Sequence, residues 1–262
     1  MENKSTQNLK EAILTSAKGD YRVTVVPVID STNKALRVMA GQGAPQGTVL
    51  VAEQQTAGRG RLGRSFYSPA GSGLYFSVLL RPALEVDVLK ITVAAGVAVA
   101  RAVQQVCNIY LKIKWVNDLY LANKKVCGIL AEGALDPAGG LEWCVLGIGI
   151  NVFAPQAGFG ELQHIAGALL HGEPGDALRG QLAAAVLDHF FALYGDLTDP
   201  ALLQEYRQRS YLQGKTVTAV QGQKRVQGTV VGIGNGAELL IQTKEGEQLA
   251  FSSGEVQLED YR

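Results

Sequence analysis

The sequence is poor in the residues that build disulfide frameworks and metal sites. It has three cysteines and three histidines in 262 residues, and neither set has the spacing of metal ligands. An odd number of cysteines suits reduced thiols packed as small hydrophobic side chains, as in a cytoplasmic protein, better than disulfides. We therefore expect no metal held by protein side chains alone, ordinary histidines and a cytoplasmic location. These residues are Cys107, Cys127, Cys144, His164, His171 and His189.

Long apolar segments and a net charge are also absent. The longest apolar run, residues 91–100, is about half a membrane span, and residues 1–22 lack the apolar core of a signal peptide. Formal net charge is zero, with 24 basic and 24 acidic residues. No global charge therefore attracts nucleic acid or an anionic membrane, and we expect neither as a partner. The 47% of hydrophobic residues can fill a large core.

Acidic residues are missing over one stretch that is rich in arginine. Three arginines alternate with three glycines, and no carboxylate lies between Glu53 and Glu85 to neutralise them. Glycine lets a backbone approach a ligand closely, and guanidinium groups hold phosphate or carboxylate oxygens in bidentate fashion. The glycines spell G-x-G-x-x-G, but no helical pattern follows and the P-loop lysine is missing. We therefore predict a mobile anion-binding loop of another kind, with Gly58, Arg59, Gly60, Arg61, Gly63 and Arg64.

The pattern of apolar residues predicts an α+β domain over most of the chain. Strands are expected at residues 21–29, 48–54, 74–80, 111–115, 119–122, 125–132 and 141–150. Helices are expected at residues 34–40, 88–106, 162–171, 176–194 and 200–209, after a short, loosely packed helical segment at 9–17. Ser31 and Thr32, between a strand and a helix, suit helix capping and ligand binding equally well.

The last fifty residues have a different pattern. Short β-rich segments at 216–220, 224–233, 237–243, 247–251 and 255–258 alternate with turns. This is typical of a small barrel. We therefore divide the chain into a large α+β domain, residues 1–212, and a C-terminal barrel, residues 213–262.

Five motifs follow one another along the chain: Ser31-Thr32-Asn33, Gln55 to Arg64, Lys114-Trp115-Val116-Asn117-Asp118, Lys125-x-x-Gly128 and Gly147-Ile148-Gly149-Ile150-Asn151. Together they resemble the motifs of the biotin protein ligases. The resemblance implies a mixed, mostly antiparallel sheet packed with helices, the class II synthetase-like or biotin-lipoate ligase fold, with an SH3-like barrel at the C-terminus. Members that also repress transcription carry an N-terminal helix-turn-helix domain, and only about 20 residues precede the first expected strand here, so we expect the form without it.

Three positions depart from the family pattern. Val116 stands where proline is usual, Phe66 where tryptophan is usual, and Cys127 where a small residue is common. None of these changes removes a charge. Phe66 keeps an aromatic face while losing the indole N–H, so affinity for adenine is the property most affected.

The resemblance implies a two-step reaction. Biotin and ATP, with Mg²⁺, form biotinyl-5′-AMP and pyrophosphate, and a lysine of biotin carboxyl carrier protein then takes the biotin. That carrier belongs to acetyl-CoA carboxylase or another biotin-dependent carboxylase. Both reactants of the first step are anions, so fixed cations are needed to offset their repulsion. A homodimer is left open.

Roles for individual residues follow from the same resemblance. Lys125 would bridge the biotin carboxylate and the α-phosphate. Arg61 and Asp118 are the other expected catalytic residues, and Asn117 and Asp118 would serve the metal or the incoming lysine. The expected biotin-binding residues are Ser31, Thr32, Asn33, Gln55, Gly58, Arg59, Gly60, Arg61, Lys125 and Gly128. The expected ATP-binding residues are Arg61, Arg64, Phe66, Lys114, Asn117 and Asn151.

Simpler readings of these residues remain open. By itself Lys125 reads as an exposed lysine in a hairpin, and its neighbour Lys124 should then point to the opposite side. Asn117, Asp118 and Asn151 could each be turn residues that satisfy local backbone. For the whole chain, the alternatives are a lipoate or octanoate transferase and a sensor that holds biotinyl-adenylate without using it.

Overall fold

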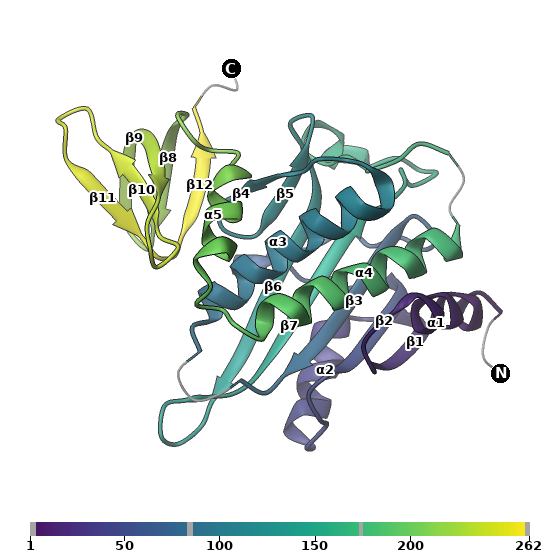
Figure 1. Cartoon of the computed structure of the whole chain (residues 1–262). Coiled ribbons are helices and arrows are strands. Elements are labelled where there is room, and N and C mark those ends of the chain that lie inside the picture. Colours follow the sequence, from purple (N-terminus) through teal and green to yellow (C-terminus); the bar gives the residue numbers. More distant parts are fainter. Residues whose placement is uncertain (1–3, 83–85, 173–174, 260–262) are drawn as a thin grey trace.

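The computed structural model describes residues 4–82, 86–172 and 175–259, which form two β-sheets and the helices packed on them (Figure 1). The first three and last three residues, included in the two expected domains, lie outside the described residues. The larger sheet and its helices account for residues up to about 210. The smaller sheet stands at one side, next to α5 and the β4–β5 hairpin (Figure 1).

The larger sheet has seven strands in the order β1-β2-β3-β7-β6-β5-β4. Only β1 and β2 are parallel, so the sheet is mixed and mostly antiparallel, as the sequence predicts. Short turns join β4 to β5, β5 to β6 and β6 to β7, whereas residues 56–72 connect β2 to β3. The parallel strands β1 and β2 are connected through a helix, as a parallel pair requires. The strands are β1 (Arg22–Ile29), β2 (Thr48–Gln55), β3 (Gly73–Leu80), β4 (Lys112–Lys114), β5 (Asp118–Leu121), β6 (Lys124–Leu135) and β7 (Leu141–Asn151).

Helices cover both faces of this sheet. On one face lie α1 (Lys4–Ser16), α3 (Val88–Cys107) and α4 (Asp176–Tyr194), with α5 (Pro200–Gln208) beside α3. On the other face α2 (Thr32–Gly41) packs Leu36 against Leu50 and Leu79, which alternate with residues that face the first core. By length and composition α3 could cross a membrane, but 67% of its most apolar stretch is buried inside the protein.

The N-terminal helix differs from the expectation of a loosely packed segment. Leu9 and Ile13 are fully buried, and α1 packs along α4. The close approach is made at Gly180, where a side chain would overlap Ala12. The carboxylate of Asp188 on α4 also accepts the backbone N–H of Lys18 at 2.9 Å. The prediction of loose packing was wrong, because the partner surface lies about 170 residues away in sequence.

The expected helix at 162–171 is also absent. The structure has only a short 3₁₀ turn, η2 (Gly160–His164), after which the backbone pairs with two strands. Lys125 N–H donates to the Ile165 carbonyl at 2.8 Å, and Leu169 N–H donates to the Asn151 carbonyl at 2.9 Å. These sheet-like hydrogen bonds replace the helical ones, so tertiary pairing overrides a locally helical pattern.

The smaller sheet is antiparallel and has the order β11-β10-β9-β8-β12. Its expected strands are confirmed to within two residues, and β9 and β12 have the expected bounds. Its buried residues, among them Val217, Leu239 and Phe251, join the main core. The expected mixed fold with a small C-terminal β-domain is therefore confirmed. The strands are β8 (Thr216–Gln221), β9 (Lys224–Ile233), β10 (Leu239–Gln242), β11 (Gln248–Phe251) and β12 (Glu255–Leu258).

Candidate active site

One cavity of about 620 Å³ lies where the arginine-glycine loop crosses the large sheet. Its walls come from both sheets and from the segment around η2. Five cationic side chains and two carboxylates line it, so the described lining carries an excess of three positive charges. These side chains are Arg59, Arg61, Arg64, Lys114, Lys125, Asp118 and Glu255.

The arginine-glycine loop connects β2 to β3, as expected, and folds back on itself. Its 3₁₀ turn, η1 (Arg61–Gly63), requires the left-handed region at Gly63, where φ is 75°. Gly58 packs closely against Phe66 and Ser68, because a Cβ at this position would lie 2.8 Å from Ser68 Oγ and would overlap the Phe66 carbonyl. The loop thus depends on glycine for its shape as well as for access to a ligand.

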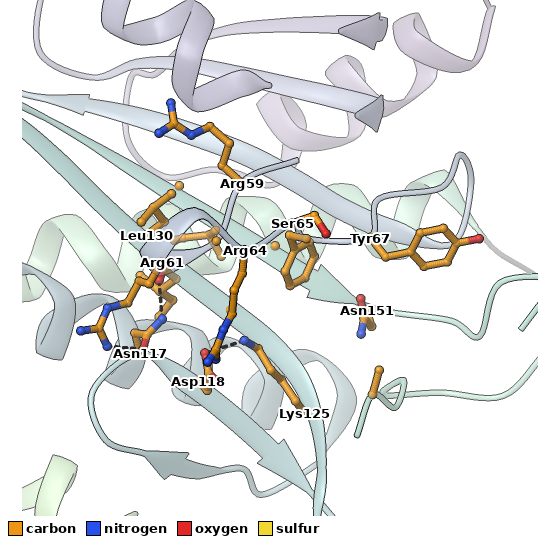
Figure 2. A pocket seen from close by; sticks show the side chains of 18 of the residues that line it. Arg59, Arg61, Arg64, Ser65, Tyr67, Asn117, Asp118, Lys125, Leu130 and Asn151 are labelled. Atoms are coloured by element: carbon orange, nitrogen blue, oxygen red, sulfur yellow. Dashed lines mark hydrogen bonds and ion pairs between the residues drawn. The ribbon is translucent and has the colours of Figure 1, made fainter. Parts of the chain in front are cut away.

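The arginines of the loop point in different directions (Figure 2). Arg59 turns away from the others and pairs with Glu132 at 3.2 Å. Arg61 donates to Asn117 Oδ1 at 3.1 Å and to the Gly254 carbonyl of the smaller sheet at 3.1 Å. Arg64 forms an ion pair with Glu255 at 2.6 Å. Two of the three arginines therefore link the loop to the C-terminal β-domain.

Lys125 and Asp118 form an ion pair inside the cavity. The Lys125 Nζ lies 2.7 Å from Asp118 Oδ1, a buried oxygen with no hydrogen-bond donor other than this ammonium among the described residues (Figure 2). The neighbouring Lys114 is partly buried. Burial lowers the pKa of Lys114, an effect that Asp118 opposes and Lys125 reinforces. The site therefore concentrates positive charge on a small surface.

Lys124 points away from Lys125, as the hairpin pattern predicts. It does not line the cavity, and its Nζ donates to the carbonyls of Gln163 and His164 at 2.8 Å each. These bonds hold the segment around η2, whose Leu162 and Ile165 line the cavity although they are 38% and 49% exposed. Lys124 thus supports the cavity wall from outside.

A polar cluster forms the other end of the cavity. Ser31 caps α2 by accepting the Lys34 N–H at 3.4 Å, and it also lines the cavity, so both of its expected roles are compatible with the structure. The backbone N–H of Thr32 donates to Gln55 Oε1 at 2.9 Å. Gln55 Nε2 donates to Ser68 Oγ at 3.0 Å. Paired amide and hydroxyl groups of this kind suit a ligand with both donors and acceptors.

Glycines on β6 and β7 make room for an aromatic floor. A Cβ at Gly149 would lie 2.5 Å from the Phe66 ring, and one at Gly128 would lie 3.1 Å from it. Phe66 also meets Tyr75 edge to face, with ring centroids 6.3 Å apart. The aromatic residue expected to contact adenine is therefore seated on glycine backbone within the cavity.

The structure brings almost all of the expected site residues to this one cavity. The exception is Gly58, which does not line it and instead packs against Phe66 and Ser68. The expected residues that line the cavity are Ser31, Thr32, Asn33, Gln55, Arg59, Gly60, Arg61, Arg64, Phe66, Lys114, Asn117, Asp118, Lys125, Gly128 and Asn151.

Other lining residues were missed by sequence reasoning. Gly254 and the first three residues of β12 line the cavity, and the segment around η2 contributes Phe159, Leu162, Ile165 and Ala166. The apolar spacing of Leu162 and Ile165 is the available signal, and it predicts the helix at 162–171 that the structure does not have. No local signal marks Gly254 and the start of β12, because their place depends on how the two sheets pack.

Comparison with family models defines the class of protein. Residues 25–151 match the Biotin/lipoate A/B protein ligase family, and residues 213–258 match the Biotin protein ligase C terminal domain. The first match contains the cavity's loop and strands, and the second contains the smaller sheet. The two matches therefore define the chain as a protein ligase of the biotin and lipoate kind.

Individual relatives narrow this class. The biotin–[acetyl-CoA-carboxylase] ligase of Mycobacterium tuberculosis is 31% identical, over 95% of this chain and 94% of that protein. The bifunctional ligase/repressor of Bacillus spizizenii is 31% identical, over 95% of this chain and 78% of that protein. The biotin protein ligase of Aquifex aeolicus, solved with biotin and ATP, has a TM-score of 0.76 at 29% identity, covering 91% of this chain and 98% of that one. The chain belongs to the biotin protein ligases, enzymes that use ATP to join biotin to a carboxylase carrier protein.

Proposed function

We propose that the cavity binds biotin at its polar end and ATP at its cationic end, with the two reacting groups meeting at Lys125. The observation that carries this assignment is the arrangement of Thr32 and Gln55 at one end and of Arg61, Arg64 and Lys125 at the other. The ureido ring of biotin has donors and an acceptor that need matched partners, since an unpaired buried group costs about 1–3 kcal/mol. The phosphates of ATP need cations. Each end of the cavity offers what one substrate requires.

In the first step the biotin carboxylate attacks the α-phosphorus and pyrophosphate leaves. Both groups are anionic, so their repulsion grows as the oxygen approaches the phosphorus. The ammonium of Lys125 offsets that repulsion, and Asp118 holds the ammonium in place at 2.7 Å. Arg61, Arg64 and Lys114 would bind the remaining phosphate charge. Asn151, whose Nδ2 donates to the Gly167 carbonyl at 2.9 Å, keeps its Oδ1 for the adenine amino group.

In the second step a lysine amine attacks the mixed anhydride and AMP leaves. The activated ester must be kept from water until the amine arrives. Leu162 and Ile165 provide apolar cover at the wall of the cavity, and Phe66 provides its apolar floor. We propose biotin carboxyl carrier protein as the natural source of the lysine and a cytoplasmic setting. All three cysteines are unpaired, as a reducing compartment allows.

Mg²⁺ fits this site as a companion of ATP. No group of three potential ligands among histidine, cysteine, aspartate and glutamate occurs in the described residues, so a cation would depend mainly on phosphate oxygens. Asp118 is the side chain suited to hold it, because Oδ1 lacks a donor other than Lys125. When bound, Mg²⁺ neutralises phosphate charge and improves pyrophosphate as a leaving group. The Asn117 Oδ1 is already engaged by Arg61.

Lipoate is the second candidate for the acid substrate, because the family model covers ligases for both. The polar end of the cavity argues against it. Lipoate carries a dithiolane ring without hydrogen-bonding N–H or C=O groups, so Thr32 and Gln55 would be left without ligand partners. We therefore expect selectivity for biotin.

The proposed substrates can be tested directly. The protein is incubated with Mg²⁺, ATP and either biotin or lipoate, and pyrophosphate, acid-labile adenylate and transfer to a carrier domain are measured. We expect all three signals with biotin and background levels with lipoate. Adenylate formed from lipoate alone contradicts the assignment, and adenylate without transfer supports the sensor alternative.

Ligand binding is expected to protect the arginine-glycine loop from proteolysis. The exposed Arg59 and Arg64 are trypsin sites, and biotinyl-adenylate would supply counter-charge that orders them. Cleavage between residues 59 and 64 is followed by mass spectrometry with and without saturating biotinyl-adenylate. We expect slower cleavage with ligand. Cleavage within the exposed β10–β11 turn at Lys244 serves as the control, and equal slowing at both sites argues against a local effect.

Removal of the C-terminal β-domain is expected to affect ATP more than biotin. Its residues Gly254 and Glu255 contact Arg61 and Arg64, whereas Thr32 and Gln55 have no such contact among the described residues. A chain truncated after Gln213, with circular dichroism confirming that it folds, should bind ATP at least roughly 10-fold more weakly, as for one lost charge-assisted contact. Calorimetry with each substrate measures this. Complete loss of biotin binding in a folded truncation contradicts the proposed position of biotin.

A further inference from the structure

The polar end of the cavity rests on a buried serine that does not line it. Ser77, on β3, is fully buried, and its hydroxyl lies 2.7 Å from Thr32 Oγ1 and 2.6 Å from Asn33 Oδ1. A serine hydroxyl carries one proton, so Ser77 can donate to only one of these oxygens. Which of the two oxygens receives the Ser77 proton determines whether the Thr32 hydroxyl donates a hydrogen bond to a ligand or accepts one.

The orientation of the Asn33 amide determines this choice. Asn33 Nδ2 donates to Glu132 Oε2 at 3.0 Å and to the Leu130 carbonyl at 3.3 Å, and both groups only accept. The Glu132 carboxylate is itself held by two ion pairs, since its Oε1 lies 3.1 Å from Arg37 and 3.2 Å from Arg59. With the nitrogen fixed on that side, Asn33 Oδ1 faces Ser77 and can only accept. The proton of Ser77 therefore goes to Asn33.

The proton of Thr32 is then directed as well. Ser77 Oγ accepts it at 2.7 Å, and the other near partner, Gln55 Oε1 at 3.1 Å, is also an acceptor. The Gln55 amide is oriented by Ser68, whose hydroxyl donates to the Phe66 carbonyl and accepts from Gln55 Nε2. Thr32 therefore donates into the protein, and its lone pairs remain for the cavity.

We propose that Ser77 is a positioning residue that makes Thr32 Oγ1 a hydrogen-bond acceptor toward the cavity, so that it binds an N–H of the ureido ring and not its C=O. This rests on the proposed biotin site and specifies the polarity of one contact in it. The second N–H of Gln55 Nε2 suits the ureido carbonyl. The β3–β7 register places Ser77 opposite Gly147, where any side chain would overlap Asn33 Oδ1. Strand β3 thus supplies the Ser77 hydroxyl as donor, and β7 supplies, at Gly147, the space that the Asn33 side chain occupies.

Biotin analogues with one ureido N–H replaced by a ring oxygen test the polarity. Such cyclic carbamates keep the carbonyl and lose one donor. For the unaltered protein, calorimetry should show that one of the two isomers binds at least about 10-fold more weakly than biotin, because its oxygen faces the Thr32 lone pairs. In Thr32→Val, which removes the hydroxyl while keeping the shape, that isomer and biotin should differ by less than about 3-fold.

Substitution of Ser77 tests the relay itself. Ser77→Ala should weaken biotin binding roughly 3- to 10-fold, as for one or two lost neutral hydrogen bonds, and leave ATP affinity unchanged. The matched control is Thr92→Val on α3, which removes another buried hydroxyl, bonded to the Val88 carbonyl, and should change neither affinity. Thermal unfolding of both variants is measured alongside.

Three outcomes overturn the inference. The first is equal binding of both carbamates and biotin by the unaltered protein. The second is an equal loss of biotin and ATP affinity in Ser77→Ala, which indicates general damage. The third, no biotin binding by the unaltered protein, removes the proposed biotin site as well and is thereby distinguished from failure of the relay alone.

Discussion

Replacing Lys125 with alanine is expected to slow adenylation by roughly 10²- to 10³-fold, about 3–4 kcal/mol, as for the loss of one oxyanion donor. Its ammonium lies in the cavity 2.7 Å from Asp118, with 31% of the side chain exposed. The charge is therefore fixed and only partly solvated. Repulsion between carboxylate and phosphate is largest near the transition state, so the substitution should reduce kcat more than it raises either KM. Pyrophosphate release at saturating biotin and ATP measures the effect.

The control variant for this experiment must replace a turn lysine that neither lines the cavity nor supports its wall. Lys124 is unsuitable, because its bonds to the Gln163 and His164 carbonyls hold a segment that lines the cavity. Lys244, exposed in the β10–β11 turn, is the better choice, and Lys244→Ala should keep the unaltered rate. Circular dichroism confirms folding of each variant. Similar rates for Lys125→Ala and Lys244→Ala would mean that Lys125 has no catalytic role in this protein.

Replacing Arg179 with methionine is expected to destabilise the fold by about 3–5 kcal/mol, the usual cost of removing one partner of a buried ion pair. Arg179 lies on α4 with 3% of its side chain exposed, and it donates to Glu53 Oε2 at 2.7 Å and to the Gly73 carbonyl at 3.2 Å. Without it the Glu53 carboxylate stays buried, and among the described residues the Ser5 hydroxyl is its other side-chain donor. Urea unfolding followed by circular dichroism measures the change.

Two further variants separate burial from charge as the cause. Lys34→Met breaks an ion pair with Asp30 whose side chains are 65% and 40% exposed, and it should lower the free energy of unfolding far less than Arg179→Met does, because solvent screens an exposed pair. The double variant Glu53→Leu, Arg179→Met removes both buried charges and should be more stable than Arg179→Met alone. Arg179 joins Glu53 on β2 to Gly73 on β3, the two strands that flank the arginine-glycine loop. If Arg179→Met lowers the free energy of unfolding no more than Lys34→Met does, this buried pair does not hold the two strands together.

Local sequence predicted most elements because their signals are local. The helix at 176–194 and the strands at 224–233 and 255–258 have the predicted bounds. Their apolar spacing, turns and caps lie within the segments themselves, so no distant residue is needed to define them. The segment at 162–171 has similar apolar spacing, yet its backbone groups pair with Lys125 and Asn151. There, hydrogen bonds to two strands that are distant in sequence replace the helix that the local pattern predicts.

The candidate site shows the same division. Its arginine-glycine loop is recognisable in sequence because glycine conformation and fixed charge are properties of the residues themselves. Asn117, Asp118 and Lys125 were assigned through the family resemblance, because by themselves they read as turn residues and an exposed hairpin lysine. Gly58 was assigned to the ligand, whereas in the structure its missing side chain makes room for Ser68 and Phe66. A glycine pattern alone does not say whether a ligand or another part of the chain makes the close approach.

The sequence by itself determined the class of the protein, the order of its elements and the chemistry available to its loop. Tertiary structure decided which groups meet: Arg179 with Glu53 across 126 residues, Ser77 with Asn33 across 44, and Arg61 with Gly254 across 193. Such pairings depend on strand register and on the packing of the two sheets. Neither leaves a periodic or compositional trace at the residues concerned, so only the folded chain shows them.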